Sequence, residues 1–370
     1  MSLSKKLSIV TSLYFLAFHP SHAAIPADIP SDFQVTAVSL TSVNDVVFNA
    51  STQELLVSVG SLAGYGYGNS ITRIGLNGTI LGSQFVGSEP GKIALSSDGT
   101  VGYVALQAAP SIKQFNALTG TTISSISTPS STYSGATRAE DIAVSPDNAN
   151  VIAVSISNTC CSPRHEGVYI IENGQVLPNR TPGHTGSNTI EFGANGSILY
   201  GYNNETTEFG FRTMSVNNAG VSTTSVTGGA LYGFYQTFTY EAGLAYSSSG
   251  VVFNPSTGEQ LGKFSLPYDA TFTASVTTKR AYAIDGARRL TVFDFDTFTP
   301  IATFNLAGQL NDTNISKLIY TQSGSLAAIG PTGVYVLSAV PEIGSMWMMI
   351  LGLFGLMATV KISHHYRETR

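Results

Sequence analysis

The sequence predicts an all-β fold, a seven-bladed β-propeller, for the residues between its two ends. Valine, isoleucine, tyrosine, phenylalanine and threonine, which favour strands, recur throughout, and many of the 37 glycines fall between them as turns. A hairpin of one short apolar strand, a turn rich in Asp, Asn, Gly or Ser, and a second strand recurs seven times. Corresponding positions lie 47, 49, 48, 48, 34 and 46 residues apart, which is typical of one four-stranded blade per step.

The repeated hairpins differ in clarity. The clearest copies are 93–106 and 142–154, and weaker copies are 46–57, 190–200, 237–246, 272–283 and 318–328. Their corresponding positions are Phe48, Leu95, Val144, Phe192, Tyr240, Ala274 and Tyr320. A second hairpin follows several of them, at 112–126, 251–264 and 290–304. A large antiparallel sandwich is the alternative, since it also has short strands and even turns, but the near-constant step favours the propeller.

Ring closure is expected from the two ends of this region. Residues 34–40 precede the first repeat and have no hairpin partner nearby, whereas 333–337 form the third strand of the last repeat. We expect 34–40 to be the outer strand of that last blade, because closing the ring removes an exposed sheet edge. The segments Ser145-Pro146-Asp147 and Tyr103-Val104 resemble the repeats of YVTN-type propellers, and this resemblance implies seven blades.

The first residues have the layout of a secretory signal peptide. Lys5 and Lys6 precede an apolar run at 7–18, and small residues at Ser21 and Ala23 mark a cleavage site before Ala24. We therefore expect residues 1–23 to be removed on export and the propeller to span 24–339.

The last residues predict a membrane span and a sorting signal. Residues 343–360 carry no charge and are long enough to cross a bilayer as a helix, and a basic tip follows them. Together with Val340, Pro341 and Glu342, this arrangement at 340–370 resembles the PEP-CTERM signal of bacterial surface proteins, although Ile343 replaces the second proline. The resemblance implies an exosortase as partner, cleavage near Pro341, and a cell-surface or extracellular location, with the helix as a transient or permanent anchor.

The charge of the body argues against a nucleic-acid ligand. The tails hold five of the 18 Lys+Arg and two of the 23 Asp+Glu, so residues 24–339 keep 13 basic and 21 acidic side chains. Nucleic-acid binding requires clustered Lys and Arg that displace counterions from phosphates. The sequence thus predicts no nucleic-acid partner.

The only two cysteines, Cys160 and Cys161, are adjacent. An even count in an exported chain favours a disulfide, yet neighbouring α-carbons are closer than in ordinary disulfides. Two alternatives stay open: a vicinal disulfide, or two free thiols. A metal site is not expected, because no other cysteine can contribute.

Three groups of residues are candidate binding sites. Arg138, Glu140 and Asp141 form the densest charge cluster, just ahead of an inner strand and hence near a channel mouth; a structural ion pair is the alternative. Arg164 and His165 follow the cysteine loop and could face the channel. Tyr65 and Tyr67, in a Gly-Tyr-Gly-Tyr-Gly segment, offer flat faces that stack on sugars or on a protein, unless they fold back on a blade.

These observations predict an exported propeller that acts as a non-enzymatic binding module for exopolysaccharide or surface proteins, with no cofactor or metal. The alternative is an extracellular or periplasmic hydrolase, similar to lactonase propellers, with its site at the channel mouth. Converging carboxylates with Arg or His in the channel would favour the enzyme. A channel lined by Ser, Thr and aliphatic residues would favour the binding module.

Overall fold

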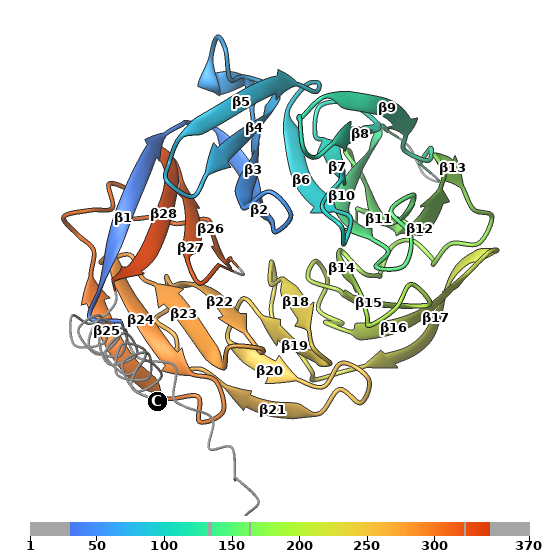
Figure 1. Cartoon of the computed structure of the whole chain (residues 1–370). Helices are drawn as coiled ribbons and strands as arrows, with labels where there is room; N and C mark the ends of the chain where they lie inside the picture. Colours follow the sequence, from blue (N-terminus) through green and yellow to red (C-terminus); the bar gives the residue numbers. More distant parts are fainter. Residues whose placement is uncertain (1–29, 132–134, 163, 322, 341–370) are drawn as a thin grey trace, which may run out of the picture.

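The computed structural model describes residues 30–131, 135–162, 164–321 and 323–340. These residues form seven four-stranded antiparallel sheets arranged as the blades of a ring (Figure 1). The predicted all-β, seven-bladed propeller is confirmed. The signal-peptide site, Pro341, Glu342 and the span 343–360 lie outside the described residues, and no helix within the described part is long and apolar enough to cross a membrane.

The innermost strands surround the central axis of the ring, and we use the word channel for the region along this axis (Figure 1). They are β2 (Val43–Asn49), β6 (Pro90–Leu95), β10 (Thr137–Val144), β14 (Thr189–Phe192), β18 (Phe238–Glu241), β22 (Thr271–Ser275) and β26 (Lys317–Tyr320). All seven corresponding positions of the repeat fall on these strands. The repeat period therefore located the channel wall correctly.

Three further strands complete each blade. The second strands are β3 (Glu54–Val59), β7 (Val101–Leu106), β11 (Val151–Asn158), β15 (Ile198–Tyr202), β19 (Leu244–Ser247), β23 (Arg280–Ile284) and β27 (Leu326–Gly330). The third are β4 (Ser70–Gly75), β8 (Ser111–Asn116), β12 (His165–Glu172), β16 (Phe211–Asn217), β20 (Val251–Phe253), β24 (Arg289–Asp294) and β28 (Gly333–Val340). The outer strands are β5 (Ile80–Phe85), β9 (Thr122–Ser127), β13 (Gln175–Val176), β17 (Gly220–Thr227), β21 (Gln260–Lys263), β25 (Pro300–Asn305) and β1 (Asp32–Ser39).

The seventh blade closes the ring with strands from both ends of the propeller. β1 pairs with β28 along its whole length, from Asp32 opposite Val340 to Ser39 opposite Gly333. The outer strand expected at 34–40 is thus confirmed, although the strand begins two residues earlier, at Asp32. This pairing removes one exposed sheet edge and holds the two ends of the propeller together.

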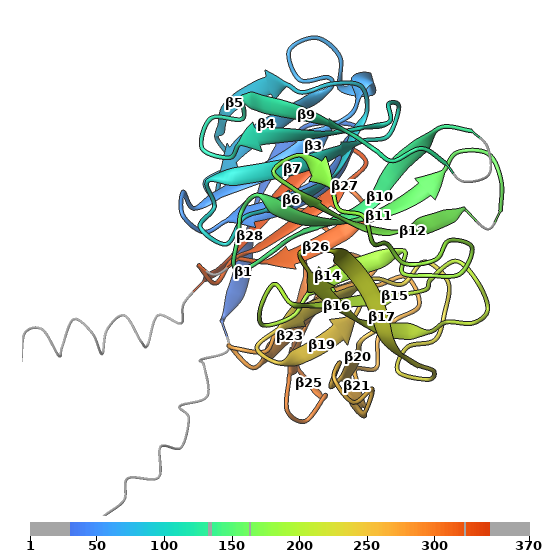
Figure 2. The same cartoon turned by 90° about the vertical axis from the view of Figure 1, so that its right-hand side faces the viewer.

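The ring has two faces, which we name by the innermost strands. These strands begin at the start face and end at the end face. Because neighbouring strands in a blade are antiparallel, β28 runs parallel to β26 and ends at the end face, where β1 begins. Figure 2 shows β1 and β28 meeting at this side of the ring. Loops between second and third strands, and from an outer strand to the next blade, therefore lie on the start face.

Apolar side chains fill the space between adjacent blades. Val46 and Val57 of the first blade, for example, pack with Ala327 and Val336 of the seventh, and all four are buried. Burial of each such valine contributes about 1.5–3 kcal/mol. The blades thus form a rigid support for the loops of the start face.

Candidate functional site

The charge cluster at 138–141 lies inside an innermost strand. The expectation of a loop ahead of the strand was wrong, because β10 already begins at Thr137. Its pairing with β11 shifts between Ala139 and Asp141, so Glu140 is the extra residue of a β-bulge. A bulge redirects the side chain of the extra residue. Glu140 is partly exposed, whereas Asp141 is buried.

Glu140 belongs to a network with three side chains from loops of the start face. The Nδ2 atom of Asn188, just before β14, donates to Glu140 Oε2 at 3.2 Å and to Glu205 Oε2 at 3.3 Å. Arg164 Nε, from the loop before β12, donates to Glu205 Oε1 at 2.7 Å. We call Glu140, Arg164, Asn188 and Glu205 the mouth network. It joins the third and fourth blades beside the channel.

The two carboxylates of the mouth network share one amide. Burial raises the pKa of Glu140 to about 7, the hydrogen bond from Asn188 opposes this rise, and the nearby charge of Glu205 adds to it. The hydrogen bond to Glu205 raises the pKa of Arg164. Near neutral pH, Glu140 therefore exists in both protonation states and can donate or accept a hydrogen bond.

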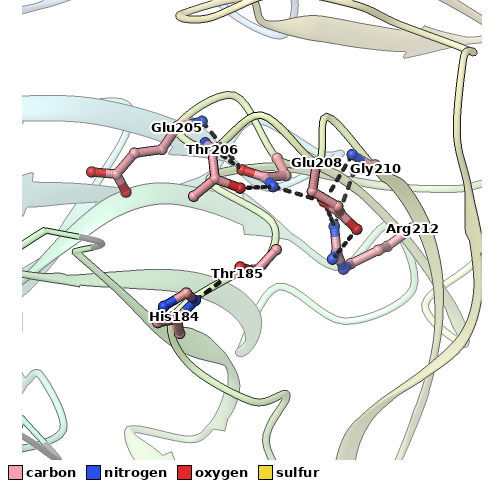
Figure 3. A network of polar contacts seen from close by, with 8 residues as sticks. His184, Thr185, Glu205, Thr206, Glu208, Gly210 and Arg212 are labelled. Carbon is pink, nitrogen blue, oxygen red and sulfur yellow. Dashed lines mark hydrogen bonds and ion pairs between the residues drawn. The ribbon is translucent and has the colours of Figure 1, made fainter.

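Hydrogen bonds also fix the loop that carries Glu205. Asn203 Oδ1 accepts from the backbone N–H groups of Glu205 and Thr206, at 3.2 and 3.1 Å, and its Nδ2 atom donates to Glu208 at 2.7 Å. Glu208 also forms an ion pair of 2.7 Å with Arg212. Figure 3 shows these contacts and the Glu205 carboxylate pointing away from them. The loop is thus braced from within, and its carboxylate is left for the mouth network.

The structure does not bring Arg138 or His165 into this network. Arg138 is partly exposed and has no ion pair or side-chain hydrogen bond in the described part of the chain. His165, expected in a loop, is the first residue of β12 and is only 1% exposed. Burial, followed by the charge of Arg212, lowers the pKa of His165 to about 4. Its ring is therefore neutral and enclosed at neutral pH.

An aromatic loop at 230–236, which the sequence analysis missed, lies beside the mouth network. It connects β17 to β18 and carries three exposed rings: Tyr232 is 78% exposed, Phe234 50% and Tyr235 85%. The rings of Tyr232 and Phe234 pack on buried Phe209, with centroids 4.7 and 4.8 Å away. The signal was present in the sequence, since Leu-Tyr-Gly-Phe-Tyr has the glycine-and-aromatic composition of the 64–68 segment.

This aromatic loop is anchored although its rings are exposed. The hydroxyl of buried Tyr202 donates to the carbonyl of Gly233 at 2.9 Å. The N–H of Tyr235 donates to the carbonyl of Asn204 at 3.0 Å, and Asn204 Nδ2 donates to the carbonyl of Gln236 at 2.9 Å. Asn204 directly precedes Glu205, and the phenol of Tyr235 is close enough to affect the pKa of Arg164. The aromatic loop and the mouth network therefore form one continuous surface.

The two tyrosines predicted as a stacking pair have different environments. Tyr65 is fully exposed in the loop between β3 and β4, on the start face. Tyr67 is partly buried and packs against the core between the first and seventh blades. Tyr67 therefore folds back on a blade, which was the alternative to stacking. Of these two tyrosines, only Tyr65 is free to stack on a ligand.

The adjacent cysteines are bonded to each other in the structure, with α-carbons 3.8 Å apart. Their backbone N–H groups both donate to Asn158 Oδ1, at 3.1 Å from Cys160 and 2.8 Å from Cys161. The backbone N–H of the same Asn158 donates to the carbonyl of Arg164 at 2.8 Å. The disulfide therefore borders the mouth network and supports its arginine.

Ion pairs connect neighbouring innermost strands. Lys317 Nζ lies 2.5 Å from Asp45 Oδ1, and Lys92 Nζ lies 3.7 Å from Asp141 Oδ1. The second oxygen of each aspartate accepts a backbone N–H from the following blade, Ile93 for Asp45 and Ile190 for Asp141, both at 2.9 Å. These charges join one innermost strand to the next.

A cavity of about 900 Å³ lies along the innermost strands of the fifth, sixth, seventh and first blades. Its walls come from β2, β18, β22 and β26, the turns that flank them, and Tyr246 of β19, and they are mainly threonine, serine, tyrosine, phenylalanine and aliphatic side chains. Its two charged side chains are Glu241 and Lys317. The channel thus has a charged side and a hydroxyl-rich side.

The comparisons with known proteins add no family. No protein-family model and no curated protein sequence matches this chain. Among residues 30–131, 135–162, 164–321 and 323–340, no three His, Cys, Asp or Glu side chains are grouped to hold one metal ion. Fold and site together define a seven-bladed propeller with an aromatic and acidic surface on its start face.

Proposed function

We propose that this chain is an exported cell-surface propeller that binds extracellular polysaccharide without catalysing a reaction. The observation that carries the proposal is the aromatic loop held rigidly beside the mouth network. Three exposed rings on a braced loop place apolar area in water that a ligand can cover. The carboxylates of Glu140 and Glu205 next to them can accept hydrogen bonds.

Sugars suit this combination of groups. The C–H faces of a sugar ring pack on flat aromatic side chains, and tyrosine offers such a face with little rotamer entropy to lose. Sugar hydroxyls donate to carboxylate oxygens, which Glu140 and Glu205 provide. Asn188, which is only 1% exposed, uses its amide to hold the two carboxylates together. Arg164 is already engaged by Glu205, so a neutral or weakly charged polymer fits better than a polyanion.

The position of the chain ends supports a surface role. β28 ends at the end face, and the proposed sorting signal follows it directly. Attachment through that segment would direct the start face, with its aromatic loop, away from the attachment point. We therefore propose an exosortase as processing partner and polysaccharide as ligand at the opposite face.

Polysaccharide capture tests the binding role. The protein, Tyr232→Ala with Tyr235→Ala, and the single variant Tyr268→Ala are mixed with extracellular polysaccharide of the producing cells, and the bound carbohydrate is quantified. Tyr268 is a matched control, because it is fully exposed in another loop of the start face. We expect at least a tenfold loss for the double variant and none for the control, because stacking area is lost only from the proposed platform. Equal capture by all three proteins would overturn the proposal.

A hydrolase is the second candidate, and one observation favours it. Glu140, with a pKa of about 7, faces Glu205 across the amide of Asn188, and such a pair can act as general acid and base. The test is to follow reducing ends released from the polysaccharide and lactone opening by the same protein. Activity that Glu140→Gln abolishes would establish the enzyme and displace the binding module.

A further inference from the structure

The cavity on the hydroxyl-rich side of the channel is separate from the start-face surface. Its lining extends from Ser316, just ahead of β26, to Thr277 and Thr278 in the turn after β22, and so from one end of the innermost strands to the other. Its volume of about 900 Å³ lies within the range of small-molecule sites. None of its lining residues belongs to the mouth network or to the aromatic loop.

Both charged side chains of the cavity already have partners. Glu241 accepts hydrogen bonds from the backbone N–H groups of Val276 and Thr277, at 2.8 and 3.3 Å, and from the hydroxyls of Ser275 and Thr277, at 3.2 and 2.8 Å. Lys317 is paired with Asp45. A charged ligand would therefore find no free opposite charge and would lose hydration without compensation.

Among the polar groups of the lining are two phenols that have no hydrogen-bond partner in the described residues. Tyr240 and Tyr320 line the cavity, are partly buried, and make no side-chain hydrogen bond in the described part of the chain. Their rings are fixed: Tyr320 stacks on Tyr282 with centroids 5.7 Å apart, and Tyr240 packs on Tyr200 at 5.6 Å. A partly buried phenol without a partner gains a hydrogen bond when a ligand supplies one.

The repeat places these two tyrosines at the same level of the channel. Tyr240, Ala274, Tyr320 and Phe48 are corresponding positions of the fifth, sixth, seventh and first blades, and all four line the cavity. Ala274 is the smallest of the seven corresponding residues. At this level the wall thus has two phenols and a phenyl ring, and the small side chain of Ala274 leaves space between them.

We propose that this cavity is a second binding site, for a neutral polyhydroxylated small molecule of one or two sugar rings. Tyr240 and Tyr320 hydrogen-bond its hydroxyls from opposite sides of the wall, and the rings and threonines cover its faces. The site does not depend on polysaccharide binding at the start face.

Titration with small sugars tests the proposal. Glucose, maltose and cellobiose, with glucuronate and glucosamine as charged counterparts, are titrated into the protein and followed by calorimetry or ligand-observed NMR. We expect saturable binding of at least one neutral sugar and at least tenfold weaker binding of the charged ones. Absence of saturable binding for every neutral sugar, or equal binding of the charged ones, would overturn the proposal.

Conservative variants locate the site. Tyr240→Phe with Tyr320→Phe keeps both rings and removes both hydroxyls, so the affinity for the neutral sugar should fall roughly tenfold. Tyr268→Phe is the control, since it removes a fully exposed phenol that does not line the cavity, and it should bind as the wild type does. Tyr232→Ala with Tyr235→Ala should also retain sugar binding, which separates this site from the start-face surface. Unchanged affinity in the Tyr240/Tyr320 variant would contradict the assignment.

Discussion

Lys317 on the innermost strand of the seventh blade donates a hydrogen bond of 2.5 Å to Asp45 on the innermost strand of the first. The contact lies at the channel, where the last blade meets the first, and it complements the β1–β28 pairing at the rim. Burial alone would raise the pKa of Asp45, but the charges of Lys317 and Lys92 lower it overall. The ring is therefore closed by the backbone hydrogen bonds between β1 and β28 at its rim and by the ion pair between Lys317 and Asp45 at the channel.

The first prediction concerns this ion pair. Lys317→Met leaves the buried Asp45 carboxylate without its main partner, so we expect the free energy of unfolding at pH 7 to fall by about 3 kcal/mol. Because the pKa of Asp45 is lowered in the folded state, the contribution is present above pH 3.8 and is lost as the pH falls through the folded value. Urea unfolding measures it, with Lys263→Met on the exposed strand β21 as control. Equal stability of the two variants would show that the pair does not hold the ring.

The second prediction concerns pH. Burial, together with the charge of Asp141, raises the pKa of Glu191 on β14 to about 8 from an ordinary value of 4.5. Between these values the unfolded chain releases the proton and the folded protein keeps it, so this group makes stability fall as the pH rises. Glu191→Gln removes the effect: its free energy of unfolding should match that of the wild type near pH 4.5 and exceed it by roughly 4 kcal/mol near pH 8. Thermal unfolding between pH 4.5 and pH 8 measures this difference in stability, with Glu259→Gln, in an exposed turn, as the control. A difference between Glu191→Gln and the wild type that does not grow with pH would contradict the prediction.

The third prediction concerns the disulfide. Cys160 and Cys161 enclose almost no chain between them, so replacing both with serine should change the free energy of unfolding by less than about 1 kcal/mol. Mass measurement after alkylation without reduction should show no modified cysteine. A loss of several kcal/mol in the double variant would mean that the loop at 158–164 supports more than Arg164.

The fourth prediction concerns processing. The sequence ends predict that the mature surface form lacks residues 1–23 and the segment after about Pro341. Intact-mass measurement on protein recovered from the producing cells determines both ends. A mass that retains Arg370 would leave a plain C-terminal anchor and remove the sorting signal.

Sequence reasoning recovered the ring but not its site, for a physical reason. A blade is a local unit, so its period and its innermost strand can be read from Phe48 to Tyr320. The mouth network combines Glu140 of strand β10 with three side chains from loops of the third and fourth blades, and only the assembly of these blades brings them together. Composition could still have indicated the aromatic loop. It could not separate Tyr65 from Tyr67, because burial depends on which side of the loop packs on the blade.

One measurement tests the central claim of binding without catalysis most directly. Purified extracellular polysaccharide is incubated with the protein, and bound carbohydrate and chain length are recorded on the same sample. We predict saturable binding that requires Tyr232 and Tyr235, with the chain length of the polysaccharide unchanged after prolonged incubation. Shortened chains, or saturable binding that survives loss of both tyrosines, would contradict the account.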